Sequence, residues 1–131
     1  SRWRVSVLNA GYQLCDSYPS QVIVPASFSD NDLPDVFAYR SKGRLPVLTY
    51  YHTNGAAITR SAQPMPGISG RTCAADERLL ECIRTANNLL PQPSPLYIFD
   101  ARPRINALGN QAAGAGYELT GTGTGYAECK L

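Results

Sequence analysis

The sequence predicts a mixed α/β fold, with a mixed sheet and flanking helices, on three observations. Short strand-like runs alternate with helical patterns along the 131 residues, and the last apolar run leads directly into a helical segment. Apolar residues make up 44% of the chain and charged residues 17%, proportions typical of a globular protein rather than a disordered one. A chain of this size can bury roughly two-thirds of its extended surface, so we expect one modest core.

Five segments are expected to form strands. The first alternates polar and apolar residues, the second is stopped by Pro25, and the third is rich in strand-forming residues. The dipeptide Asn54-Gly55 is a strong hairpin signal, so the fourth strand should return beside the third. The fifth is a continuous apolar run, which predicts a strand buried on both faces. The five segments are Arg4–Leu8, Gln21–Val24, Pro46–Tyr51, Ala56–Arg60 and Leu96–Phe99.

Three segments are expected to be helical. Ser29 is a candidate N-cap for a helix that ends near Arg40. Residues 74–88 begin with acidic side chains and then place leucine and isoleucine on one side, the pattern of an amphipathic helix. A proline suits the first turn of a third helix over residues 103–113. The glycine-rich residues 114–125 are expected to form a loop.

Charge and hydropathy exclude several classes of protein. Twelve lysines and arginines against ten acidic residues leave a net charge of +2. That excess is too small for nucleic-acid or membrane binding through bulk charge, so an anionic partner would need a local cluster. The sequence contains no run of about 18 apolar residues, so no transmembrane helix is expected.

Side chains that bind metals or act as nucleophiles are scarce. A single histidine, His52, lies beside the predicted hairpin turn, so we expect neither a metal site nor a cofactor. The four cysteines show no CxxC spacing and are interpreted as reduced thiols. A cysteine phosphatase needs an arginine six positions after its cysteine, because the guanidinium and loop amides together bind the phosphoryl oxygens. The residues at that position are Gln21 after Cys15, Leu79 after Cys73 and Asn88 after Cys82, and Cys129 lies two residues from the last residue. None of the four cysteines has the spacing.

Several segments, read together in order and spacing, resemble the myotubularin family of phosphatases. The similarity spans nearly the whole chain, and the last segment is the most specific. The segments are Leu14–Ser20 with Val24-Pro25, Tyr39–Leu48, Arg60–Pro64, Gly70-Arg71 ahead of Asp76-Glu77, and Phe99–Ala107 continuing to Asn110, Ala113, Gly114 and Gly116–Glu118.

The resemblance implies a fold like that of protein tyrosine phosphatases and a metal-independent reaction. Such enzymes remove the 3-phosphate from phosphatidylinositol 3-phosphate and the 3,5-bisphosphate through a cysteinyl-phosphate. In the family the CxxxxxR loop lies downstream of the segment seen here, and a PH-GRAM domain precedes it. Residues 1–131 are therefore expected to be the N-terminal part of a phosphatase domain, inactive when alone.

The resemblance also suggests which residues contact the substrate. Asn110 is expected to border the inositol head group, where a neutral amide can bond sugar hydroxyls; Asn106 is a weaker candidate that could instead pin the loop. Three basic residues, Arg40, Lys42 and Arg44, are candidate contacts for lipid phosphates, with a solvated turn as the alternative interpretation. Asp100 and Arg102 are interpreted as a structural pair, with no catalytic residue among the 131.

Two other functions stay open at the level of sequence. The longer protein could be a phosphatase-like adaptor that lacks the nucleophile and acts by binding an active partner, and this half of the domain cannot separate the two. A stand-alone binding domain would have to fold without exposing a sheet edge. For the phosphatase we expect a phosphoinositide head group as partner, a peripheral membrane surface, a homo- or heterodimer, no nucleic acid, and a cytoplasmic location that includes endosomal membranes.

Overall fold

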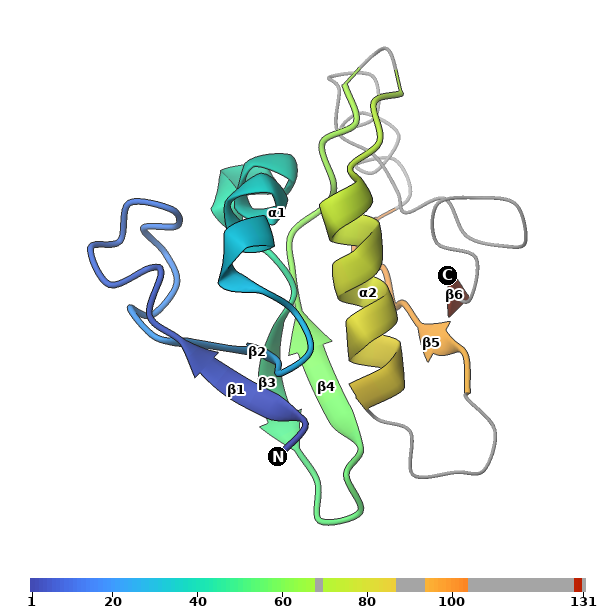
Figure 1. The fold of residues 1–131 in the computed structure, drawn as a ribbon. Helices are drawn as coiled ribbons and strands as arrows, with labels where there is room; N and C mark the ends of the chain where they lie inside the picture. The colour runs from blue at the N-terminus through green and yellow to red at the C-terminus, as the bar shows by residue number, and fades with distance from the viewer. Residues whose placement is uncertain (68–69, 87–93, 104–128, 131) are drawn as a thin grey trace.

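The computed structural model describes residues 1–67, 70–86, 94–103 and 129–130, and within them it is a mixed α/β protein, as predicted (Figure 1). The two longer helices stand side by side, with two antiparallel strand pairs at their lower end and a third strand pair beyond α2. The elements in chain order are β1 (Trp3–Ser6), β2 (Val22–Pro25), η1 (Asp30–Asp32), α1 (Leu33–Tyr39), η2 (Ser41–Gly43), β3 (Val47–Tyr51), β4 (Ala57–Arg60), α2 (Ala74–Ala86), β5 (Leu96–Tyr97) and β6 (Cys129–Lys130).

Within the described residues the strands form three separate pairs, whereas a single mixed sheet was expected. Strands β1 and β2 are antiparallel, β3 and β4 are antiparallel, and β5 pairs in parallel with β6. Strand β2 lies against β3 without joining its ladder. The described strands have only two to five residues, so each ladder is short and side-chain packing holds the pairs together.

The core lies between the two helices and the β1–β2 pair. Helix α2 turns Ala75, Leu79, Leu80 and Ile83 inward, which confirms the amphipathic pattern read from the sequence. Burial of each large aliphatic or aromatic side chain in such a core contributes about 1.5–3 kcal/mol. The buried cluster consists of Trp3, Cys15, Val22, Val24, Phe28, Leu33, Val36, Phe37, Leu45, Val47, Ala75, Leu79, Leu80 and Ile83.

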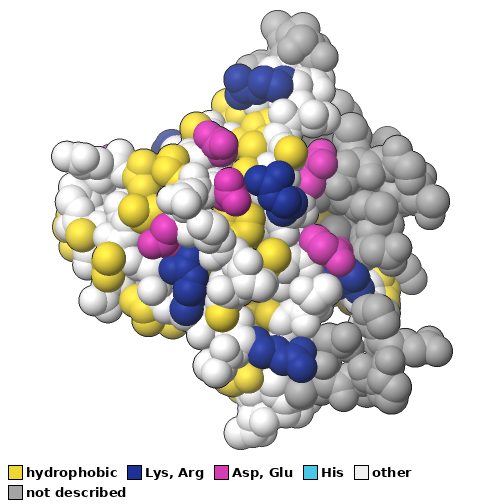
Figure 2. All heavy atoms as spheres, viewed as in Figure 1, with side chains coloured by type: hydrophobic (Ala, Val, Ile, Leu, Met, Phe, Trp, Pro, Cys, Tyr) yellow, Lys and Arg dark blue, Asp and Glu magenta, His cyan; other side chains and the backbone are white. Residues whose placement is uncertain are grey.

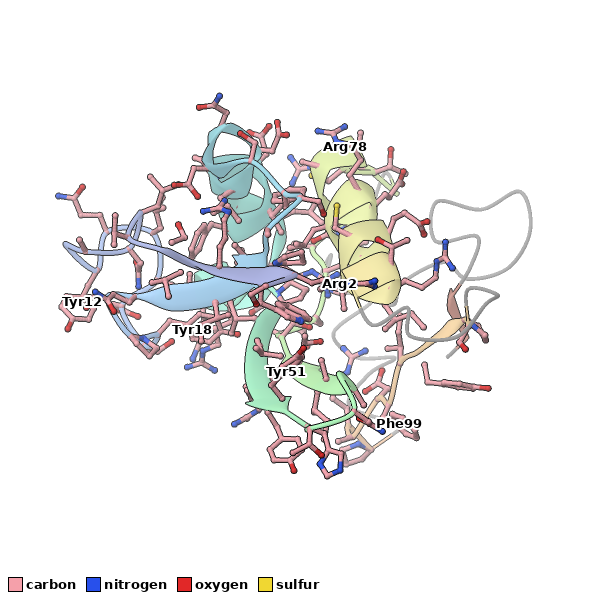
Figure 3. All side chains as sticks on the ribbon, turned by 60° about the horizontal axis from the view of Figure 1, so that its bottom comes forward. Arg2, Tyr12, Tyr18, Tyr51, Arg78 and Phe99 are labelled. Carbon is pink, nitrogen blue, oxygen red and sulfur yellow. The ribbon has the colours of Figure 1, made fainter. Side chains whose placement is uncertain are left out.

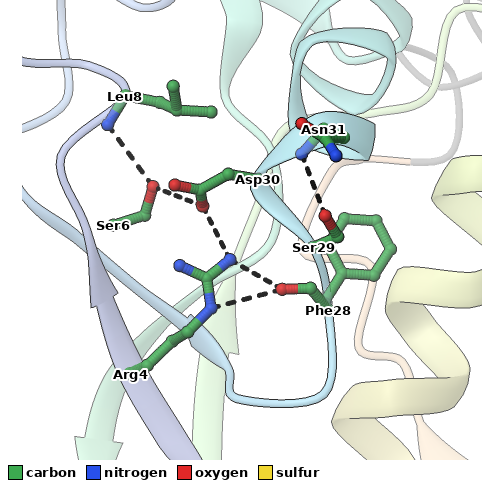
Figure 4. Close-up of polar contacts among 7 residues, drawn as sticks. All are labelled: Arg4, Ser6, Leu8, Phe28, Ser29, Asp30 and Asn31. Atoms are coloured by element: carbon green, nitrogen blue, oxygen red, sulfur yellow. Dashed lines mark hydrogen bonds and ion pairs between the residues drawn. The ribbon is translucent and has the colours of Figure 1, made fainter.

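A polar network ties β1 to the start of the first helix (Figure 4). The Arg4 guanidinium donates to the Phe28 carbonyl, through Nη2 at 2.6 Å, and to Asp30 Oδ1, also at 2.6 Å. The Ser6 hydroxyl donates to the same Asp30 oxygen at 3.0 Å. Ser29 Oγ accepts from the Asn31 amide at 3.1 Å, so Ser29 caps the 3₁₀ turn η1. The N-cap of α1 itself is Asp32, whose side chain makes no capping hydrogen bond.

The predicted hairpin between β3 and β4 is confirmed. Asn54 Oδ1 accepts from the Ala56 amide at 2.9 Å, and Gly55 has φ +86°, a conformation that glycine adopts without strain. His52 belongs to this turn, because its amide donates to the Ala56 carbonyl at 2.8 Å and its ring Nδ1 lies 2.8 Å from the Tyr50 hydroxyl.

The expectation that residues 96–99 are buried on both faces is wrong. Strand β5 covers only Leu96 and Tyr97; Tyr97 is 60% exposed and Phe99 is 90% exposed. Within the part of the chain that the structure describes, β5 packs on α2 with one side only, so alternate side chains face outward. Phe99 lies beyond the end of the strand (Figure 3). The predicted helix over residues 103–113 and the loop over 114–125 fall almost entirely outside the described residues.

No helix among the described residues is long and apolar enough to cross a membrane.

Candidate functional site

The described parts of several segments that carry the family resemblance lie against one another in the fold. The chain on either side of Arg40 runs antiparallel to residues 62–65, because the Ser41 amide donates to the Gln63 carbonyl at 3.0 Å and the Met65 amide donates to the Tyr39 carbonyl at 2.8 Å. The Ala62 amide in turn donates to the Arg44 carbonyl at 2.8 Å. Two motifs about 20 residues apart in sequence are thus joined through their backbones.

A buried ion pair connects helix α2 to the joint that the chain around Arg40 forms with residues 62–65. Arg40 Nε donates to Asp76 Oδ1 at 2.8 Å and Nη2 donates to Asp76 Oδ2 at 2.7 Å, a two-pronged geometry that suits guanidinium and carboxylate. Both side chains have no exposed surface. Arg40 Nη1 also donates to the Ala62 carbonyl at 3.0 Å, so one guanidinium links the turn after α1, the loop after β4 and the first turn of α2.

The segment after β5 joins the same cluster through a glutamine. Arg102 Nη2 and Nε donate to the two carboxylate oxygens of Asp100 at 2.6 and 2.9 Å, which confirms the predicted pair. Arg102 Nη1 donates to Gln63 Oε1 at 3.0 Å, 39 residues away in sequence. The hydrogen bond from Arg102 holds the pKa of Asp100 below its ordinary value, so this carboxylate is ionised at neutral pH and committed to its partner.

The turn at residues 41–43 has an unusual backbone. Lys42 and Gly43 both have positive φ, +55° and +69°. A Cβ added to Gly43 would lie 2.2 Å from the Leu14 carbonyl oxygen, so only glycine fits against the loop that precedes Cys15. The close approach fixes the turn, and the Lys42 side chain is exposed.

The first resembling segment, residues 14–20, is anchored to the other end of the same turn. Arg44 Nε donates to Ser17 Oγ at 2.8 Å, and the Tyr18 hydroxyl donates to the Leu45 carbonyl at 2.9 Å. Burial raises the pKa of Tyr18 to about 12. Tyr18 therefore stays a neutral hydrogen-bond donor at neutral pH and stabilises the contact of residues 14–20 with Leu45.

The residues predicted to contact ligand differ in their burial and in their hydrogen-bond partners. Arg40 is enclosed and its donors are used within the fold, so a solvated turn is the wrong description of this residue. Lys42 is exposed and Arg44 is half-buried against Ser17, and contact of either with lipid phosphate stays a prediction. Asn106 and Asn110 lie outside the described residues.

Two residues that hold this site together, Gln63 and Asp76, have no role that is predicted from the sequence. Asp76 reads as an ordinary acidic residue in the first turn of a helix, and Gln63 as part of a loop. Both belong to segments that carry the resemblance, which was the one available signal. Their partners lie 36 and 39 residues away, at separations that local patterns do not reveal.

The described thiols and acids form no metal site of their own. Cys15 is buried, Cys73 and Cys82 are half-buried, and all three are free. Among the residues that the structure describes, no group of three or more histidine, cysteine or acidic side chains is close enough to hold a metal ion. On the face drawn in Figure 2, basic and acidic side chains interleave rather than gather by sign.

Comparison with known proteins agrees with these motifs. A family model described as "Myotubularin-like phosphatase domain" matches residues 1–131. The chain is 48% identical over 118 residues to Myotubularin of Xenopus tropicalis, covering 89% of this chain and 19% of that protein. It is 45% identical over 117 residues to Phosphatidylinositol-3,5-bisphosphate 3-phosphatase MTMR2 of Pongo abelii, covering 88% of this chain and 18% of that protein. The MTMR2 protein of Gallus gallus is also 45% identical, with 88% of this chain and 20% of that protein covered.

The chain spans about a fifth of the length of the curated relatives it matches. Since the family model covers every residue, including the joint formed by Arg40, Gln63, Asp76 and Arg102, the chain belongs to the myotubularin-like phosphatase domain family.

Proposed function

We propose that this chain forms one wall of the substrate pocket in a phosphatase that removes the 3-phosphate from phosphatidylinositol 3-phosphate and the 3,5-bisphosphate. The observation that carries the proposal is the family match over residues 1–131, together with relatives named as phosphatidylinositol-3,5-bisphosphate 3-phosphatases. In such an enzyme the reaction runs through a cysteinyl-phosphate on a CxxxxxR loop, and none of the cysteines in these 131 residues has that spacing.

The role of this chain in the reaction is to position groups and bind the head group. The Asp100–Arg102 pair follows β5 and is bonded to Gln63, so it holds the start of the segment that carries Asn106 and Asn110. Neutral amides suit inositol hydroxyls, which donate and accept hydrogen bonds without charge. Asp100 is not proposed as the general acid, because its pKa is lowered and both carboxylate oxygens are bound by Arg102.

The proposal includes the setting of the whole protein. We infer a cytoplasmic enzyme that works on the surface of a membrane, endosomal membranes included, as a homo- or heterodimer, and that takes its substrate from the lipid layer. Arg44 keeps part of its surface exposed, and it is the residue of the predicted set that we propose for such a contact.

The test compares the 131-residue chain with the intact protein that carries it. Phosphate release from vesicles containing phosphatidylinositol 3-phosphate is expected for the intact protein and not for the chain alone. Asn110→Ala in the intact protein should lower turnover and leave its melting temperature nearly unchanged. An equal loss of both would assign Asn110 to structure.

Two further outcomes bear on the proposal. Steady turnover by the chain that survives replacement of all four cysteines by serine would reveal another chemistry. An intact protein that carries no CxxxxxR sequence and releases no phosphate would be the adaptor instead, and its binding to an active family member would then be measured.

A further inference from the structure

A groove opens on the surface beside helix α1, and neither Asp100 nor Arg102 is among its described lining residues. Its volume is about 690 Å³, and it lies between α1, the turn at residues 41–43, the loop before Cys15 and the loop that leads to α2. Leu14, Pro34, Phe37 and Met65 supply apolar lining, and Lys42 and Arg71 supply charge. We call this the Lys42–Arg71 groove.

Lys42 is held at the groove by the backbone around it. Its own φ is +55°, a left-handed conformation that non-glycine residues seldom adopt, and the next residue is the glycine packed against the Leu14 carbonyl. The Gly43 amide donates to the Arg40 carbonyl at 3.0 Å, and Arg40 is itself locked to Asp76. Backbone strain of this kind persists where the surroundings enforce it and is concentrated at ligand-binding positions.

Arg71 is held on the opposite element. Its amide donates to the Pro66 carbonyl at 2.6 Å, and its carbonyl accepts from the Tyr39 hydroxyl at 2.8 Å. The guanidinium carbon lies 6.0 Å from the centre of the Tyr39 ring, the range of a cation–π contact. The residue is exposed, so the stacked guanidinium keeps donors available to solvent and to a ligand.

The charge of the groove is one-sided. Among the described residues that line it, none is acidic, and no ion pair to Lys42 or Arg71 is among those the structure describes. An anionic group therefore complements the two cations, while an apolar group complements the lining between them. A phosphorylated sugar matches the cations and not the lining, because its hydroxyls would lose water without gaining partners there.

We propose that the Lys42–Arg71 groove binds an acidic peptide segment of a partner protein, with an apolar side chain on the groove floor and Asp or Glu carboxylates on Lys42 and Arg71. An apolar side chain complements the lining formed by Leu14, Pro34, Phe37 and Met65. Two basic residues are also fewer than the about four to eight that mark a lipid-binding cluster. This interaction is separate from the phosphatase reaction and does not depend on it.

The test is a binding selection on the intact protein that carries these residues. A randomised seven-residue phage library is panned against it, and enriched peptides are synthesised with a fluorescein label. The peptides are expected to place an acidic residue within two positions of an apolar one. The variant Lys42→Asn with Arg71→Gln removes both charges, and asparagine tolerates the left-handed backbone at position 42. We expect it to weaken binding about tenfold or more, as loss of charge-assisted hydrogen bonds would.

The matched control is Arg78→Gln, which removes an exposed arginine of α2 outside the groove (Figure 3) and should leave the affinity unchanged. The melting temperatures of all variants are compared, so that a loss of folding is recognised. Enriched peptides without acidic residues, or an affinity that the double variant does not alter, would overturn the proposal. Loss of binding to phosphatidylserine vesicles in the double variant, with peptide binding unchanged, would replace it by a lipid contact.

Discussion

The buried Arg40–Asp76 pair makes the most direct test of how this fold is held together. Asp76→Asn keeps the shape of the side chain but removes the charge that faces the guanidinium. Both side chains are fully buried, so the remaining cation is left uncompensated away from water. Breaking one partner of a buried pair costs about 3–5 kcal/mol. Against a total stability of about 5–15 kcal/mol, such a loss removes a large part of the free energy of unfolding.

The measurement is urea denaturation of the 131-residue chain, followed by the fluorescence of Trp3. This residue is the only tryptophan of the chain and is 7% exposed, so its emission reports the opening of the core. In a thermal melt followed by the same fluorescence, a loss of 3–5 kcal/mol would appear as a fall in melting temperature of roughly 10–20 °C for a domain of this size. The control is Arg78→Gln on the same helix, whose partner Asp32 is 3.5 Å away and exposed; such pairs contribute less than about 1 kcal/mol.

A double variant separates charge from packing. Arg40→Met with Asp76→Leu removes both charges together, and replacing a buried pair by apolar residues is often neutral or stabilising. The Ala62 carbonyl then loses its donor, which costs about 1–3 kcal/mol, so we expect most but not all of the single-variant loss to be recovered. If Asp76→Asn lowers the free energy of unfolding no more than Arg78→Gln does, the Arg40–Asp76 pair is not desolvated, and the predicted stability loss of a broken buried pair is refuted.

Two further predictions concern the same region. Gly43→Ala should lower the free energy of unfolding by at least about 2 kcal/mol, because it adds left-handed strain and a contact of 2.2 Å to a backbone carbonyl. The control Gly70→Ala, at φ +73° with open space around it, should lower it only by the conformational strain of about 1 kcal/mol. Equal urea midpoints for the two variants would contradict the predicted clash at position 43. Since the pKa of Tyr18 is raised from 10.0 to about 12, the stabilisation that it supplies is complete below pH 10 and is lost as the pH rises towards 12. Tyr18→Phe should therefore flatten the alkaline loss of stability between those values, and an unchanged alkaline limb in melting experiments would show that Tyr18 does not cause it.

Local patterns predicted the elements whose signals are local. The amphipathic spacing of residues 74–88 was enough to place α2, described as Ala74–Ala86, and its buried face, and Asn54-Gly55 was enough to place the β3–β4 hairpin. In both cases the residues that decide the structure are neighbours in sequence, so one window contains the whole cause.

The remaining features depend on partners distant in sequence. The run Leu96–Phe99 predicts a strand buried on both sides, yet only one side of β5 packs on α2 among the described residues. The reason is that the composition of a strand does not show how many layers cover it. Arg40 reads as part of a charged turn because its carboxylate partner lies 36 residues further on. The resemblance identified the correct family from segments whose contacts with each other could not be seen in the sequence.

The residues that carry the resemblance and are described by the structure mostly build a scaffold. Arg40 and Asp76 lock the turn after α1 to α2, and Gln63 carries the connection to Arg102 in the segment after β5. The segment that leads from β5 towards the proposed head-group wall is thus connected to helix α2 through the hydrogen bonds of Arg40, Gln63 and Arg102. A substitution at Asp76 is therefore expected to act on a substrate site through position rather than contact. It should lower turnover of the intact enzyme and its stability together, whereas loss at Asn110 should affect turnover alone.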